Sequence, residues 1–187
     1  MDSSLLAYQV FWPLQPGDRL HPQLHRAILG VPASMQHAQK QRFYLGIFEL
    51  LAPVIPHFTA GNWDYTNDDD EAETEYRRWC QGTQDDAHDR PLMGNAAPQA
   101  PRYQFLTLLF LLKRGGKSDQ RLEQLTAMPP DQLWRRETFV KLLGAIPELH
   151  FPSVGSDAIY LCPGNGAPGL TEEELRSPRY QYLHRIV

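Results

Sequence analysis

The chain has 187 residues, a formal net charge of −4 at pH 7, 42% hydrophobic residues and 21% charged residues. A chain of this length and composition buries a core of its own and needs no disulfides to fold, and two cysteines are too few for a disulfide framework. The pI of about 5.9 argues against a general nucleic-acid-binding protein, in which a basic domain is expected.

Several features indicate a cytoplasmic protein. The two cysteines, Cys80 and Cys162, have no metal-ligand spacing and are typical of reduced thiols. The first residues lack the basic start of a signal peptide. The most apolar run, residues 105–112, falls well short of the roughly 20 residues that cross a bilayer. We therefore expect a cytoplasmic location and no membrane contact.

The elements predicted for the first half begin with a strand over residues 5–12, which are rich in aromatic and β-branched side chains. Pro22 suits the first turn of a short helix over residues 21–30, and Gly30 ends it. Apolar positions at helical spacing then predict a second helix over residues 35–51, which Pro53 ends.

The stretch from Gly61 to Cys80 holds the most concentrated acidic charge of the chain. We predict a helix there, with Thr66 or Asn67 as its cap and Gly82 as its end, because acidic side chains favour the first helical turn. A partner-binding acidic face is predicted at its start, formed by Trp63, Asp64, Tyr65, Asp68, Asp69 and Asp70. Charge supports this surface, since residues 1–100 hold 7 basic and 13 acidic residues, and the rest hold 11 and 9.

The second half follows a Pro- and Gly-rich stretch, residues 83–100, that we interpret as a loop or linker. Three helices and a hairpin are predicted after it, in the element order of a winged-helix module, and a final strand ends the chain. The helices are expected at residues 101–113, from the cap Ser118 to Ala127, and at 131–143; the hairpin is expected at residues 149–162 and the strand at residues 180–187. A capping box is predicted at Thr171–Glu174.

The resulting fold prediction is α+β but predominantly α-helical, with a helical core, a small sheet and a winged-helix-like C-terminal half. We divide the chain into an N-terminal helical region with an edge strand (residues 1–82), the linker (83–100) and the winged-helix-like region (101–187). One compact domain overall is the alternative to this division.

Weaker candidates for metal or cofactor chemistry lack the remaining parts of their motifs. His21 and His25 stand four residues apart, as two zinc ligands on a helix would, but no further ligand accompanies them. A calcium-loop spacing from Asp64 to Glu75 has Asp69 where the sharp turn needs Gly. The sequence therefore predicts neither a metal nor a cofactor, and it predicts no catalytic residue. The other candidates weighed and discounted are His88, Cys162 and the glycines Gly164, Gly166 and Gly169.

Three functions remain as hypotheses, in order of preference. The first is a non-catalytic interaction or adaptor module that binds a protein partner through the acidic face and the helix-plus-hairpin surface. The alternative is a nucleic-acid-binding winged-helix regulator that uses Arg135, Arg136 and Lys141. The third is a hydrolase or metal enzyme whose catalytic groups converge only in the fold.

Overall fold

The computed structural model describes residues 2–15, 17, 19–32, 34–88, 101–164 and 169–187, with residues 69 and 84–88 described by their backbone alone. A 6-stranded antiparallel sheet forms its centre, in the order β4-β3-β1-β2-β6, with β5 paired to β3. The strands are β1 (Ser3–Pro13), β2 (Ala60–Thr66), β3 (Arg102–Lys113), β4 (Val154–Cys162), β5 (Leu170–Thr171) and β6 (His184–Arg185).

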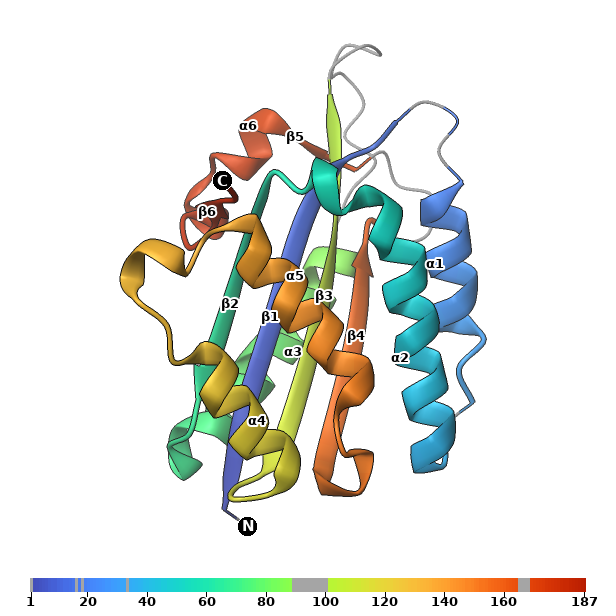
Figure 1. The fold of residues 1–187 in the computed structure, drawn as a ribbon. Helices are drawn as coiled ribbons and strands as arrows, with labels where there is room; N and C mark the ends of the chain where they lie inside the picture. The colour runs from blue at the N-terminus through green and yellow to red at the C-terminus, as the bar shows by residue number, and fades with distance from the viewer. Residues whose placement is uncertain (1, 16, 18, 33, 89–100, 165–168) are drawn as a thin grey trace.

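Helices cover both faces of this sheet (Figure 1). One face carries α1 (Leu20–Leu29), α2 (His37–Leu51), α4 (Lys117–Thr126) and α5 (Arg136–Ala145), and the other carries α3 (Asp69–His88). The short elements are α6 (Glu172–Leu175) and the 3-10 turns η1 (Ala52–His57), η2 (Pro130–Gln132), η3 (Ile146–Glu148), η4 (Phe151–Ser153) and η5 (Pro178–Tyr180).

The predicted N-terminal strand is confirmed, but β1 lies in the middle of the sheet and not at an edge. Its residues from Ser3 to Trp12 are all buried. Leu6, Tyr8, Val10 and Trp12 enter the main core beneath the four helices, and Phe11 enters a smaller core on the opposite face. A strand that is buried on both faces lacks the apolar and polar alternation that marks an exposed sheet, which is why the sequence alone did not place it.

The helix predicted over residues 101–113 is wrong, because these residues form β3. Side chains from Leu106 to Leu112 alternate between the two faces of the sheet, and both faces are covered. A short run that is apolar at every position is consistent with a buried helix or a buried strand, and periodicity does not separate the two. β1 pairs with β3 along the whole length of β1, from Ser3 opposite Lys113 to Pro13 opposite Tyr103.

The winged-helix-like half is also wrong, because residues 149–162 contain no hairpin. They form the turn η4 followed by the single strand β4, which pairs with β3. The predicted final strand shrinks to His184–Arg185 after the turn η5. The fold is therefore a mixed α+β sheet structure and not a predominantly helical one.

Other local predictions are confirmed. The helices α1, α2 and α3 occupy the predicted segments, although α3 continues past Gly82 to His88 and so enters the predicted linker. Thr171 caps α6 in a capping box with Glu174, whose backbone N–H lies 3.1 Å from the Thr171 hydroxyl. The rest of the predicted linker, residues 89–100, lies outside the described residues.

Candidate functional site

Residues of the predicted acidic face that belong to β2 point to opposite sides of the sheet. Trp63 and Tyr65 point into the main core, where Trp63 is only 8% exposed. The Trp63 indole N–H donates to the Leu133 carbonyl at 2.8 Å, and the Tyr65 hydroxyl donates to Asp119 Oδ1 at 2.5 Å. Asp64 points the other way, toward α3, and is exposed. The two aromatic side chains therefore support the sheet, and the carboxylate between them is presented to solvent.

The start of α3 follows directly from β2. Asp68 caps this helix: its side chain accepts from the Glu71 backbone N–H at 3.3 Å, and its carbonyl accepts from the Ala72 N–H at 2.8 Å. Ala72 is fully buried and seats the helix against the sheet. The capping residue lies one or two positions later than the sequence suggested, and its carboxylate satisfies a free N–H of the first turn.

A surface pocket of about 420 Å³ lies between β2, α3 and the segment that contains η5. It is open to solvent, and residues far apart in the sequence form its walls. The lining residues are Asn62, Asp64, Glu75, Arg78, Trp79, Gly82, Thr83, Arg179 and Tyr182.

Aromatic side chains form one wall of the pocket. Trp79 and Tyr182 meet edge to face, with their ring centroids 5.8 Å apart. The Tyr182 hydroxyl donates to Gln9 Oε1 at 2.8 Å, and the Gln9 amide donates to the Thr107 hydroxyl at 2.8 Å. Because Gln9 and Thr107 belong to the central strands, this chain of hydrogen bonds fixes the wall to the sheet. Both rings stay partly exposed.

The charges in the pocket are unevenly neutralised. Arg78 pairs with Glu75 at 2.7 Å, and Arg179 donates to the Gly82 carbonyl at 3.4 Å. Asp64 accepts from the Thr66 hydroxyl at 3.5 Å but forms no ion pair with any residue that the structure describes. Its carboxylate gives the β2 side of the pocket a negative charge that no ion pair among the described residues neutralises.

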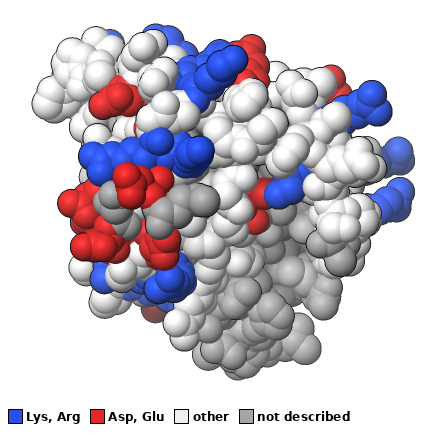
Figure 2. All heavy atoms as spheres, turned by 90° about the horizontal axis from the view of Figure 1, so that it is seen from below, with Lys and Arg blue, Asp and Glu red and all other residues white. Residues whose placement is uncertain are grey.

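Further carboxylates continue this charge beyond the pocket. We use the name acidic rim for Asp64, Asp68, Asp70 and Glu71, all of which are exposed. None of the four forms an ion pair within the described part of the chain. Figure 2 shows acidic side chains gathered at this end of the molecule, with basic side chains on either side of them. The side chain of Asp69 lies outside the described residues.

The basic residues of the nucleic-acid hypothesis do not converge. Arg135 pairs with Asp131 at 3.0 Å, and Arg136 donates to the carbonyls of Ile55 and Phe58 at 2.7 and 3.1 Å. Lys141 is exposed on α5, whose Phe139, Leu142 and Leu143 pack in the core. Arg136 thus holds η1 in place, and α5 is a core helix without a free basic face.

The structure also shows where the weak candidates for metal ligands lie. His21 and His25 stack with their ring centroids 6.1 Å apart, and His21 Nε2 lies 2.7 Å from the Pro163 carbonyl, to which it donates. No group of three or more metal-ligating side chains occurs among the described residues. The calcium-loop positions run from β2 into α3 and so do not form one loop. The side chain of His88 and part of the glycine run at 164–169 lie outside the described residues.

Sequence reasoning missed the aromatic wall. It gave Trp79, Arg179 and Tyr182 no role in a site. The spacing of these residues carries no signal, because the pairing of β6 with β2 helps to bring the C-terminal segment beside α3. The acidic character of the neighbouring surface was visible from the sequence, but the pocket was not.

Within the described residues, no helix combines the length and the apolar character needed to span a bilayer. Comparison of the chain with protein-family models, with curated proteins and with solved structures finds no match.

Proposed function

We propose that this protein is a non-catalytic interaction module that binds a partner protein at the pocket and the acidic rim. The observation that carries the proposal is the carboxylate of Asp64, which forms no ion pair with a described residue, beside the half-exposed Trp79–Tyr182 pair. Aromatic side chains are the residues that most often dominate binding energy at protein interfaces, and charge beside them selects the partner.

The chemistry of the partner follows from the charges. An acidic rim whose carboxylates form no ion pair with a described residue attracts a segment that carries Lys or Arg, and the aromatic wall accepts an apolar or aromatic side chain of the same segment. Arg78 is already paired with Glu75, so it does not cancel the charge of the acidic rim. Cys80 and Cys162 are not joined in a disulfide, which supports our further proposal that the protein works in the cytoplasm.

Partner capture with matched variants tests this function. The wild-type protein is used to isolate partners from an extract of its native cells, and each captured protein is then titrated in purified form. We expect Asp64→Lys to weaken binding about tenfold or more, because it reverses a charge inside the interface. The affinity of the wild type should also fall as salt is raised, because the acidic rim is exposed.

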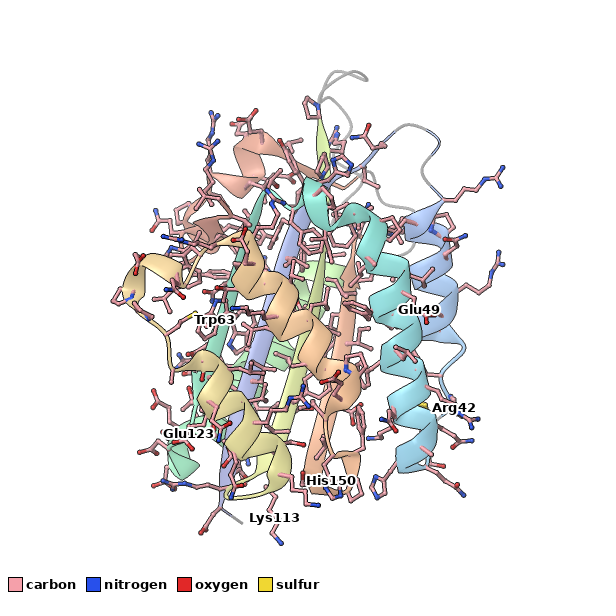
Figure 3. The ribbon with its side chains drawn as sticks, viewed as in Figure 1. Arg42, Glu49, Trp63, Lys113, Glu123 and His150 are labelled. Atoms are coloured by element: carbon pink, nitrogen blue, oxygen red, sulfur yellow. The ribbon has the colours of Figure 1, made fainter. Side chains whose placement is uncertain are left out.

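The control variant changes a carboxylate outside the site. Glu49 projects from α2, away from β2 (Figure 3), so Glu49→Lys should leave binding unchanged. Thermal unfolding of both variants checks that they fold. Equal losses from Asp64→Lys and Glu49→Lys, or a purified wild type that binds no captured protein, would contradict the proposed function.

A further inference from the structure

One edge of the sheet is open next to the pocket. β6 pairs with β2 only at Ala60 and Gly61, and the chain before β6 turns away through η5. The remaining residues of the strand, Asn62–Thr66, pair with β1 on one side. On the other side, none of their backbone groups bonds to any part of the chain that the structure describes.

The open edge lacks the usual protection. Exposed edges in natural sheets are commonly blocked by Pro, Lys or a bulge, because unpaired backbone groups recruit another strand. The sequence from Asn62 to Thr66, NWDYT, has neither Pro nor Lys, and its pairing with β1 is regular throughout. Its one charged residue is Asp64, which faces the pocket.

The charge of Asp64 selects among the strands that could pair here. A second copy of the chain would place the same acidic edge against itself, and like charges opposite one another destabilise a strand pair. A strand with Lys or Arg opposite Asp64 places opposite charges next to each other, which stabilises the strand pair. The preference for a basic segment continues past the end of β2, because the exposed residues there are Asp68, Asp70 and Glu71.

We propose that an extended basic segment of the partner adds to the sheet as a strand along Asn62–Thr66. It continues the line that β6 begins, and alternate side chains of the segment enter the pocket. Those that enter would be about 7 Å apart, which lets one basic residue meet Asp64 while a neighbouring aromatic residue meets Trp79 and Tyr182. This inference rests on the proposed function and adds the binding mode to it.

A synthetic peptide tests the strand directly. The probe is fluorescein-labelled Thr-Arg-Val-Lys-Val-Tyr-Thr, and the same residues in reverse order serve as a second probe, because an added strand can run in either direction. We expect one of the two to bind, to lose affinity about tenfold with Asp64→Lys, and to slow hydrogen exchange at residues 62–66. A peptide with Glu in place of Arg and Lys should prefer the Asp64→Lys variant.

Backbone methylation then separates strand addition from simple charge attraction. Successive N–H groups of a strand point to opposite sides, so only one alternate set faces β2. Methylation of that set of peptide nitrogens should weaken binding about tenfold or more, whereas methylation of the other set should have little effect.

The outcomes distinguish this inference from the function on which it rests. If a peptide binds and depends on Asp64, but both methylated forms bind equally, strand addition is wrong and the interaction function stands. If neither peptide binds while a captured partner does, strand addition by a basic segment is again wrong. Self-association of the wild type, abolished by a change within residues 62–66, would show that the edge serves a second copy instead.

Discussion

At the scale of single residues, two buried polar side chains stand out because no described residue gives them a hydrogen-bond partner. Trp12 and Gln104 lie opposite each other on β1 and β3 and are at most 1% exposed. Neither the Trp12 indole N–H nor the Gln104 amide has a hydrogen-bond partner among the described residues. Such a group costs about 1–3 kcal/mol when it is buried unsatisfied.

Replacing this amide should therefore stabilise the protein. Gln104→Met keeps the length of the side chain and removes its polar atoms, so we expect the free energy of unfolding to rise by about 1 kcal/mol. Urea unfolding at neutral pH measures the change. A fall of similar size would show that the amide is hydrogen-bonded in solution.

The buried tyrosines make stability depend on alkaline pH. Burial raises the pKa of Tyr76 to about 12, and its hydroxyl shares a hydrogen bond with the Ser156 hydroxyl at 2.8 Å. Burial, together with the neighbouring Asp157, also raises the pKa of Tyr44 well above its usual value of 10.0. Each raised pKa means that the folded state holds its proton more tightly than the unfolded state.

The sign of the pH effect follows from this difference. Below pH 10 both states are protonated, and the contribution of Tyr76 is fully present. As pH rises from 10 toward 12, the unfolded state loses protons first, so the free energy of unfolding falls. We expect the fall to be shallower in Tyr76→Phe. Urea unfolding across this range measures it, and identical slopes in the two proteins would contradict the raised pKa.

At the scale of elements, the packing of α5 against the sheet depends on Gly61 in β2. A Cβ at this position would lie 2.7 Å from the Gln9 carbonyl oxygen and 2.7 Å from Phe139 Cε1. The Gln9 carbonyl belongs to the backbone of the central strand and has little freedom to move. The glycine therefore permits the close approach of β2, β1 and α5.

Alanine substitutions at two glycines should distinguish the need for space at Gly61 from the general effect of a glycine on backbone flexibility. We expect Gly61→Ala to lower the free energy of unfolding by about 1–3 kcal/mol, because the core must shift to admit the methyl group. Gly46 lies inside α2, where an added Cβ would have no atom within 4 Å, so Gly46→Ala should raise stability by about 0.5–1 kcal/mol. Thermal and urea unfolding compare the two, and equal effects would contradict the role assigned to Gly61.

The elements also show where the sequence is informative. Prolines, glycines and caps marked α1, α2 and the start of α3, because these signals are local. β3 was mistaken for a helix because each of its residues from Gln104 to Phe110 is buried, which erases the two-residue alternation. That one error removed a central strand from the predicted sheet. It also supplied the first helix of the winged-helix order that we predicted.

At the scale of the whole molecule, the candidate site depends on how distant segments meet. Asp64, Asp68 and Asp70 of the acidic rim belong to the predicted acidic face, since they lie close together in the sequence, but Glu71 was not predicted. Tyr182 contacts Gln9 and Trp79 from the segment that precedes β6, which pairs with β2 and whose His184 stacks on Trp134 with the ring centroids 3.6 Å apart. No local pattern encodes such a meeting, so the aromatic wall and the open edge emerged only from the assembled sheet.

The central position of β1 has a consequence for synthesis of the protein in the cell. β1 needs β3 along its whole length, yet about a hundred residues separate the two strands in the chain. At a ribosomal rate of roughly 5–20 residues per second, β1 waits for roughly 5–20 s before its second neighbour emerges. During that interval an apolar strand has a free edge, so we expect the nascent chain to be prone to aggregation until Arg102–Lys113 leaves the ribosome.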